Sequence, residues 1–316
     1  MATFNIYVSD GLSEDGLALL RTAGNVTSNP KVTAEELAAL LPDYDALIVR
    51  SRTKVKGALL EAGTKLKVVG RAGVGIDNID VAGALKMGIT VVNSPMAASI
   101  TVAEHALGLM LAMARAIPQA DASIKAGRWE KSAFMGSELH GKKLGIMGLG
   151  RIGEQVAHLA AAFGMKVNAF DPFLNAEQII QRGACPMSFA EILTSSDYLS
   201  LHLPLTSTTC GLIGVTEIQS MKKGARVVSI SRGGIIDEVA LCDALENGHL
   251  AGAALDVFAQ EPPHPCTITQ NPKVICTPHV GAQTYEAQAR AGLAIAEEVI
   301  SVLNGQEPRW KVLRNE

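Results

Sequence analysis

The chain has 316 residues, of which 48% are hydrophobic and 19% charged, and its formal net charge is −3. This length and hydrophobic share predict a globular protein of about two domains with a substantial core. The small net charge argues against a nucleic acid or an anionic membrane as partner. The apolar run 106–114 is too short to span a bilayer, and residues 1–10 lack the layout of a signal peptide, so a cytoplasmic protein is expected.

Cysteine usage is typical of a reducing compartment. The cysteines are scattered without a C-x-x-C pair, which argues against a disulfide framework and a zinc site: Cys185, Cys210, Cys242, Cys266 and Cys276. The sequence also lacks the H-E-x-x-H, P-loop and G-x-S-x-G motifs. We therefore expect no metal, and the motifs support neither NTP hydrolysis nor serine catalysis.

Short β-rich segments alternate with helical segments along the whole chain. The candidate strands are, in chain order, 4–8, 46–49, 67–69, 90–92, 143–147, 166–170, 198–201, 226–230, 253–257 and 274–277. Several are nearly continuous apolar runs, as in parallel strands buried on both faces. Alternation of this kind predicts an α/β fold with crossover helices.

The strands are too many for one sheet, so two doubly wound parallel-sheet domains are predicted. The first comprises residues 1–97 and 284–316, and the second is a Rossmann domain over 98–283. Segments 101–115 and 283–304 have helical spacing, and we expect them to cross between the domains. Two crossings would create a hinge and a cleft, a common place for a small-molecule site.

A glycine-rich turn at 148–153 is the strongest local signal. The apolar strand 143–147 leads into Gly148, Gly150 and Gly153, a helical segment follows, and a second strand ends at Asp171. The glycines permit a tight turn, a close approach to a pyrophosphate and close helix packing, while the helix start attracts phosphate. Asp171 can accept hydrogen bonds from a ribose and would repel a 2′-phosphate, so NAD is predicted over NADP.

Three later loops carry reactive side chains. Arg232, Glu261 and His279 each follow a predicted strand, and the carboxyl ends of parallel strands meet at one sheet edge. A cation, a proton donor and a carboxylate that orients the donor are what hydride transfer to a 2-oxo acid requires. By contrast, we expect His105 to be a satisfied buried or interface histidine, and His202 to shape the cofactor loop.

At these residues the chain resembles the D-isomer-specific 2-hydroxyacid dehydrogenase family. The resemblance implies that Arg232 orients the substrate, His279 is the acid/base and Glu261 is its partner. It also implies a flavodoxin-like fold for the first domain and a homodimer formed through the second. The residues expected at the cofactor are Gly148, Gly150, Arg151, Ile152, Gly153, Asp171, Leu203, Ile230, Ser231, Arg232, Asp256 (at the nicotinamide amide), His279, Gly281 and Ala282.

Within the family the likeness is greatest to the branch that oxidises 3-phosphoglycerate to 3-phosphohydroxypyruvate in serine biosynthesis. Segments 49–54, 70–78, 93–95 and 134–136 carry this likeness. The substrate residues it suggests are Arg50, Ser51, Arg71, Gly73 and Asn93, since guanidinium groups suit phosphate. Arg52 is expected to face solvent. We expect no C-terminal regulatory domain, and Lys131 stands where some relatives carry an Arg that reaches a neighbouring subunit.

Two alternatives remain open at this point. The same scaffold suits a glyoxylate or hydroxypyruvate reductase or a D-lactate dehydrogenase, since fold does not choose substrate. A protein of another class, an NAD-sensing binding protein like the corepressors that resemble this family, would hold the same Arg, Glu and His. A panel of 2-hydroxy acids discriminates between these readings.

Overall fold

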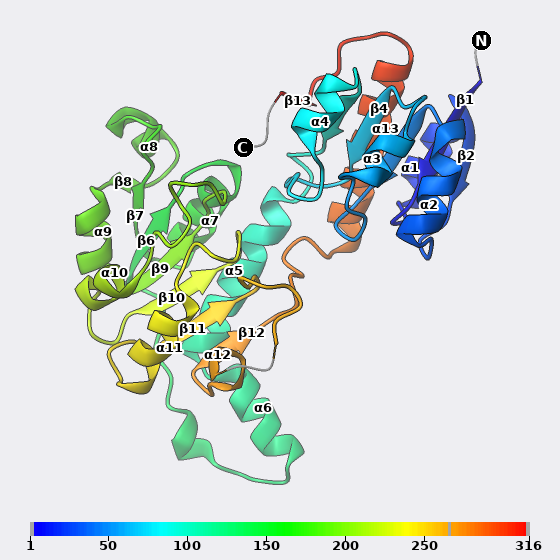
Figure 1. The fold of residues 1–316 in the computed structure, drawn as a ribbon. Coiled ribbons are helices and arrows are strands. Elements are labelled where there is room, and N and C mark those ends of the chain that lie inside the picture. Colours follow the sequence, from blue (N-terminus) through cyan, green and yellow to red (C-terminus); the bar gives the residue numbers. More distant parts are fainter. Residues whose placement is uncertain (1–2, 265–266, 314–316) are drawn as a thin grey trace. The chain divides into compact units, whose positions relative to one another are not determined.

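The computed structural model describes residues 3–264 and 267–313, so the expectation for Cys266 lies outside the described residues. The chain divides into two compact units, shown in Figure 1. Unit 1 comprises Met1–Ala98 and Ala282–Glu316, and unit 2 comprises Ser99–Gly281. Each unit is an α/β structure around its own sheet.

Unit 1 contains a sheet with the strand order β13-β5-β4-β3-β1-β2. Its strands are β1 (Phe4–Val8), β2 (Gly24–Ser28), β3 (Ala46–Val49), β4 (Val68–Arg71), β5 (Thr90–Asn93) and β13 (Lys311–Val312). All neighbours pair in parallel except β13, which runs antiparallel to β5. Its helices are α1 (Glu14–Arg21), α2 (Ala34–Leu40), η1 (Leu41–Asp43), α3 (Ala58–Ala62), α4 (Val81–Lys86) and α13 (Tyr285–Leu303).

The side-chain alternation of its strands gives unit 1 a core on each face of the sheet. In β1, Ile6 and Val8 join the cluster that contains residues of α1 and α13, whereas Tyr7 joins the cluster against α2, α3 and α4. Ile48 and Leu47 of β3 divide in the same way. Because successive side chains of a strand point to opposite faces, strands covered on both faces must be apolar throughout.

Unit 2 contains a sheet with the strand order β12-β11-β10-β9-β6-β7-β8, and all its pairs are parallel. The strands are β6 (Lys143–Met147), β7 (Lys166–Phe170), β8 (Cys185–Pro186), β9 (Tyr198–Leu201), β10 (Arg226–Ser229), β11 (Gly252–Leu255) and β12 (Val274–Cys276). The helices are α5 (Ser99–Ala114), α6 (Ile117–Lys125), η2 (Lys131–Phe134), α7 (Arg151–Ala162), α8 (Ala176–Gln181), α9 (Phe189–Ser195), α10 (Val215–Ser220), α11 (Glu238–Glu246) and α12 (Thr267–Gln270). The order around β6 and β9 is that of a dinucleotide-binding Rossmann sheet.

The doubly wound fold class predicted from the sequence is confirmed, with one correction for the helices expected to cross. Helix α5 belongs wholly to unit 2 and α13 wholly to unit 1, and the chain passes between units at 98–99 and 281–282.

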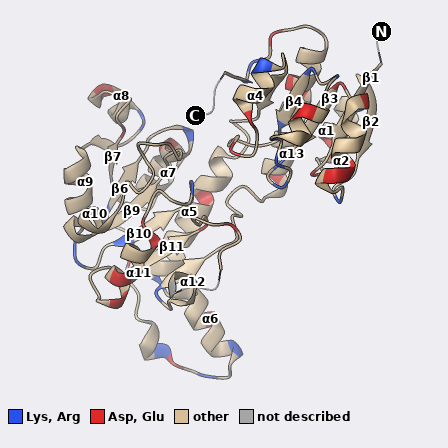
Figure 2. Ribbon diagram, viewed as in Figure 1, with Lys and Arg blue, Asp and Glu red and all other residues tan. Residues whose placement is uncertain are grey.

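Within the described residues, no single helix is long and apolar enough to cross a membrane; α5 and α6 pass such a test only as a pair bent by 63°. In the view of Figure 2, charged residues of both signs are interspersed over both units.

Candidate active site

The candidate active-site residues of unit 2 follow one row of strand ends. The register aligns Phe170, Met147, Leu201, Ser229, Leu255 and Cys276, which lie at the carboxyl ends of β7, β6, β9, β10, β11 and β12. The glycine turn, Asp171, Leu203, Arg232, Asp256 and His279 come directly after this row. Parallel pairing therefore places at one edge of the sheet residues that lie as much as 131 positions apart in the chain, from Gly148 to His279.

The glycine turn fits a dinucleotide pyrophosphate. Gly148 has φ +87°, and a Cβ there would lie 2.6 Å from the carbonyl oxygen of His202, so the turn requires glycine. A Cβ at Gly150 would meet open space, and helix α7 begins at this residue without a side-chain cap. Uncapped N–H groups and the helix dipole favour an anion at this position. A Cβ at Gly153 would lie 2.2 Å from the Gly148 carbonyl oxygen.

Asp171 follows β7 and closes the same turn. Its carboxylate accepts hydrogen bonds from the backbone N–H of Leu149 (2.9 Å) and of Phe173 (2.9 Å). A carboxylate offers about four acceptor positions, so two remain for ribose hydroxyls. Arg182, which the sequence analysis did not single out, donates to the Leu149 carbonyl oxygen at 2.5 Å from the end of α8. No motif marks it, because it lies 33 residues from its partner.

The remaining residues expected at the cofactor, apart from Ala282, follow strands of unit 2. Arg151 and Ile152 form the first turn of α7, and the partly buried Leu203 packs against the core cluster after β9. Ile230 is 5% exposed, and the Ser231 hydroxyl is buried without a partner within the described residues. Such a hydroxyl fits a site that a ligand completes. Gly281 is the last residue of unit 2, whereas Ala282 belongs to unit 1.

His279 and Glu261 form a direct pair. Nδ1 of His279 lies 2.8 Å from Oε2 of Glu261, and the two side chains are 47% and 38% exposed. The other carboxylate oxygen, Oε1, accepts a hydrogen bond from the backbone N–H of Phe258 (3.2 Å), which fixes the orientation of Glu261. Because Nδ1 is engaged, Nε2 of the imidazole is the nitrogen left to exchange a proton with a substrate. This is the arrangement of an oriented acid/base.

Arg232 lies in the loop that follows β10, where the chain comes very close to the loop of Glu261. A Cβ at Gly233 would lie 1.8 Å from the carbonyl oxygen of Phe258, so this approach requires glycine. Nη1 of Arg232 donates to the carbonyl oxygen of Ser231 at 2.7 Å. The close packing of the two loops holds the arginine and the His279–Glu261 pair on adjacent segments of unit 2.

Asp256, expected at the nicotinamide amide, is fully buried. Its carboxylate accepts hydrogen bonds from the Thr277 hydroxyl (2.6 Å) and from the backbone N–H groups of Val280 (2.8 Å) and Gly281 (2.8 Å). Burial raises its pKa, but His105 and these donors outweigh burial and hold the pKa below its usual value. The contact with the nicotinamide amide stays a prediction, while the structure adds a role inside the turn of His279.

In unit 1 the residues expected at the substrate also follow a row of strand ends. Val49 pairs with Arg71 and Arg71 with Asn93, so Arg50, Arg71 and Asn93 meet at one edge of the sheet. The Arg71 guanidinium lies over Gly73, where a Cβ would be 1.8 Å from its Nη1. The Asn93 amide donates to the carbonyl oxygen of Val74 at 2.7 Å, tying the two loops together.

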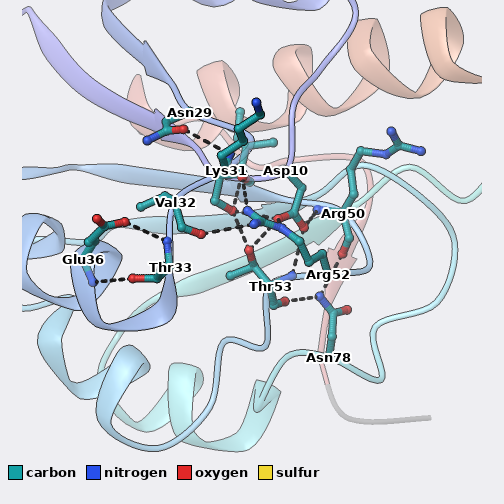
Figure 3. A network of polar contacts seen from close by, with 12 residues as sticks. Asp10, Asn29, Lys31, Val32, Thr33, Glu36, Arg50, Arg52, Thr53 and Asn78 are labelled. Atoms are coloured by element: carbon teal, nitrogen blue, oxygen red, sulfur yellow. Dashed lines mark hydrogen bonds and ion pairs between the residues drawn. The ribbon is translucent and has the colours of Figure 1, made fainter. Parts of the chain in front are cut away.

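A buried carboxylate that the sequence analysis missed organises the loop after β3. Asp10, whose side chain is 3% exposed, accepts hydrogen bonds from the backbone N–H of Arg50 (2.7 Å) and of Thr53 (3.1 Å) and from the Thr53 hydroxyl (2.5 Å). Burial raises its pKa, but these hydrogen bonds together hold it below its usual value. Figure 3 shows Asp10 at the centre of this network.

Arg52 is exposed, as expected, but its guanidinium also takes part in the same network. Its guanidinium donates to Asp10 (3.2 Å), to the carbonyl oxygen of Val32 (3.1 Å) and to that of Ser9 (2.6 Å), although the side chain is 47% exposed. The Arg50 side chain points away from this network (Figure 3), and its Nη2 donates to Gln283 at 3.3 Å. Ser51 between them is exposed. Asp10 thus binds one arginine and leaves the other with an uncharged side-chain partner.

Comparisons with known proteins agree with this geometry. The sequence profile described as D-isomer specific 2-hydroxyacid dehydrogenase, NAD binding domain, matches residues 107–281. The D-3-phosphoglycerate dehydrogenase of Bacillus subtilis is 47% identical over 302 residues, which are 96% of this chain and 57% of that protein. That of Methanocaldococcus jannaschii is 48% identical over 302 residues, 95% of this chain and 58% of that protein. The chain thus spans little more than half the length of these relatives.

A solved structure covers the whole fold. A glyoxylate reductase from Paecilomyes thermophila has a TM-score of 0.88 and 31% identity, and the match covers 99% of each chain. The resemblance stated from the sequence and the prediction of NAD as cofactor are both confirmed. The chain therefore belongs to the D-isomer specific 2-hydroxyacid dehydrogenases, and residues 107–281 of unit 2 match the NAD-binding domain of that family.

Proposed function

We propose that the chain oxidises 3-phosphoglycerate to 3-phosphohydroxypyruvate with NAD, the reaction that opens serine biosynthesis. The observation that supports a dehydrogenase is the contact of 2.8 Å between His279 Nδ1 and Glu261 Oε2, in the unit that also carries the glycine turn. The substrate is inferred from relatives named D-3-phosphoglycerate dehydrogenase that are 47% and 48% identical.

The residues of unit 2 divide the chemical step between them. Nε2 of neutral His279 takes the proton of the C2 hydroxyl, and Glu261 stabilises the imidazolium that forms. Arg232 binds the carboxylate and polarises the oxygen at C2, where negative charge develops. Bound NAD would accept the hydride that leaves C2, so that hydride and proton together account for the two hydrogens lost by the alcohol. In the reverse direction, His279 returns the proton to the carbonyl oxygen.

We assign the substrate phosphate to unit 1, with Arg50 as its main cation. Burial lowers the pKa of this guanidinium, with Asp10 opposing the shift, yet arginine stays charged in proteins. Its side-chain hydrogen bond goes to the neutral Gln283. Within the described part of the chain the Arg50 guanidinium has no ion pair with a carboxylate, and such a partly desolvated cation binds a phosphate oxygen well. Arg71, Gly73, Asn93 and Ser51 complete the proposed substrate set.

A substrate panel tests this function. Values of kcat/KM are measured with NAD for D-3-phosphoglycerate, D-glycerate and D-lactate, and with NADH for phosphohydroxypyruvate, hydroxypyruvate and glyoxylate. We expect the phosphorylated pair to be preferred by about 10- to 150-fold, the contribution of one charge-assisted contact. Equal or better rates with the unphosphorylated acids would overturn the choice of substrate. If the protein reduced NAD with none of the hydroxy acids and oxidised NADH with none of the oxo acids, the proposal that it is a dehydrogenase would be overturned.

The second candidate is a glyoxylate or hydroxypyruvate reductase. It is favoured by the match to the glyoxylate reductase structure, which covers 99% of each chain at 31% identity. It shares His279, Glu261 and Arg232 but has no need of Arg50 as a phosphate ligand. The same panel separates the two, because only the phosphoglycerate reading predicts a gain from the phosphate.

We also infer that the protein acts as a homodimer through unit 2. Helix α6 and the segment after it expose large apolar side chains: Ile117 (52%), Ile124 (56%), Trp129 (84%) and Met135 (91%). Exposed apolar area of this kind favours association. Light scattering should give twice the chain mass of 33.2 kDa, and Trp129→Glu should reduce it; a monomeric unmodified protein would exclude the dimer. The cytoplasmic location and the lack of nucleic-acid or membrane partners stay predictions.

A further inference from the structure

The backbone of His279 is held in an uncommon conformation. Its φ is +51°, in the left-handed region, where a residue with a Cβ is disfavoured. Such a conformation persists only where its surroundings impose it, and it is often found at functional sites. The turn 277–281 therefore depends on the groups that bind its backbone.

The buried residue Asp256 supplies the hydrogen-bond acceptors for the backbone of this turn. Its carbonyl oxygen accepts the N–H of His279 at 2.9 Å, and its carboxylate accepts the N–H of Val280 and of Gly281, each at 2.8 Å. Three successive N–H groups of the turn are thus bound to one residue, beginning at the histidine itself. The direction of the His279 side chain follows from the position of this carboxylate.

A second pair of side chains lies behind the carboxylate. The Thr277 hydroxyl donates to Oδ1 of Asp256 at 2.6 Å, and Nε2 of His105 lies 3.2 Å from that hydroxyl oxygen and 3.5 Å from Oδ1. Since the hydroxyl proton is directed to Asp256, its oxygen accepts from Nε2–H of His105. The result is a chain of contacts from helix α5 through Thr277 and Asp256 to the turn of His279, all within unit 2.

We propose that His105 and Thr277 are positioning residues for the acid/base His279, acting through Asp256. They fix the position of the Asp256 carboxylate, and this carboxylate holds the backbone of turn 277–281. The backbone in turn sets the direction of Nε2 of His279. The inference rests on the proposed function only in so far as His279 is the acid/base, and it does not depend on which 2-hydroxy acid is the substrate. The proposal assigns a positioning role to His105, for which the sequence predicted only a buried or interface position.

The test compares Thr277→Val with Thr277→Ser in the complete chain. Valine matches threonine in size but has no hydroxyl, whereas serine keeps the hydroxyl. We expect Thr277→Val to lower kcat by roughly 10- to 100-fold, as a small misplacement of a reacting group does, with KM and the Kd of NAD changed less than about threefold. Thr277→Ser should recover most of kcat. Equal kcat in Thr277→Val and the unmodified protein would overturn the proposal.

A second pair of variants covers the case in which Thr277→Val does not fold. His105→Gln keeps an N–H donor and should retain more kcat than His105→Leu. His249→Leu is the matched control, because the His249 side chain also makes a hydrogen-bond contact in unit 2, to the Ile218 carbonyl oxygen (2.9 Å), away from the site. If His105→Leu and His249→Leu had the same kcat, the proposed role of His105 would be contradicted.

An NMR measurement reads the turn without any substrate. The amide signals of Val280 and Gly281 should shift in Thr277→Val and in His105→Leu, but not in His249→Leu, and unchanged signals would overturn the proposal. Unchanged signals together with normal turnover in the variants contradict the positioning role. Shifted signals in the variants, when the unmodified protein oxidises no 2-hydroxy acid, would contradict the proposed function instead. The two failures are therefore distinguishable.

Discussion

The proposed proton transfer depends on two half-exposed side chains that orient each other. Glu261 is itself held by the Phe258 N–H, so His279 is bound to a carboxylate that has little freedom to turn. An acid/base of this kind acts through geometry first, because the nitrogen that moves the proton must face the substrate. Each of the two side chains can therefore be tested by its effect on kcat.

His279→Ala should lower kcat by about 10²- to 10⁴-fold in both directions, the usual contribution of general acid–base catalysis. Glu261→Gln should lower it less, because the amide still donates to or accepts from the ring but no longer stabilises the imidazolium. Steady-state kinetics with NAD and with NADH checks both. Near-normal kcat in His279→Ala would remove it from the mechanism.

Substitution of Arg50 by alanine should affect substrate binding, whereas the same substitution at Arg52 should affect stability. Arg50→Ala removes a charge-assisted contact of about 1.5–3 kcal/mol, and so should raise KM for phosphohydroxypyruvate about 10- to 150-fold and leave hydroxypyruvate nearly unaffected. Arg52→Ala removes three hydrogen bonds inside unit 1, and so should lower Tm while the preference for the phosphorylated substrate persists. Equal losses on both substrates in Arg50→Ala would exclude it as the phosphate ligand.

At the scale of elements, the strand ends of unit 2 carry one group whose charge state is fixed by burial. His202 follows β9, its Nε2 lies 2.8 Å from the Ser200 hydroxyl, and its Nδ1 is buried without a partner within the described residues. Burial lowers its pKa from 6.5 to about 4. The folded protein therefore holds this imidazole neutral at pH values where the unfolded chain binds a proton.

The free energy of unfolding should consequently fall as pH drops from about 6.5 toward about 4, and change no further through this group below that. Between pH 7 and pH 5 the unmodified protein should lose about 2 kcal/mol more than His202→Gln, at 1.36 kcal/mol per pKa unit. Urea unfolding without NAD at the two pH values measures this. Parallel losses in both proteins would show that His202 does not set the pH dependence.

Strands with a mostly apolar sequence could be predicted, and short or polar strands could not. Strands β1, β3, β6, β7 and β9 have the bounds that were expected. The edge strand β2 was not expected, because Gly24–Ser28 is largely exposed and polar, and β8 and β13 have two residues each. An edge strand is covered on fewer sides, so its sequence carries little periodic signal.

The same distinction holds for the sites. Gly148, Asp171 and His279 follow strands that were expected from the sequence, so their positions could be predicted. Asp10 and His105 could not, because their partners lie 43 residues away at Thr53 and 172 residues away at Thr277. Contacts that depend on tertiary packing leave no pattern in one sequence.

At the scale of the whole molecule, the separation into two units predicts that NAD stabilises mainly unit 2. The glycine turn, Asp171 and the strand ends proposed to bind the cofactor all belong to unit 2. At a concentration 100 times its Kd, NAD should stabilise the fold that binds it by about 2.7 kcal/mol. Hydrogen exchange should therefore slow over residues 99–281, most of all at Gly148–Asp171. Protection confined to residues 3–98 would contradict the assignment of the cofactor to unit 2.

The discontinuity of unit 1 also has a consequence for biosynthesis. Residues 1–98 leave the ribosome before unit 2, yet one face of their sheet is packed against α13, which contributes Ile295, Val299 and Leu303 to the core cluster that contains Ile6. That helix is translated only after all of unit 2. We therefore expect unit 2 to become protease-resistant on the ribosome before unit 1 does, the reverse of the usual order of domains. Until α13 emerges, the nascent chain should expose part of an apolar sheet face, the kind of surface that makes folding intermediates prone to aggregation.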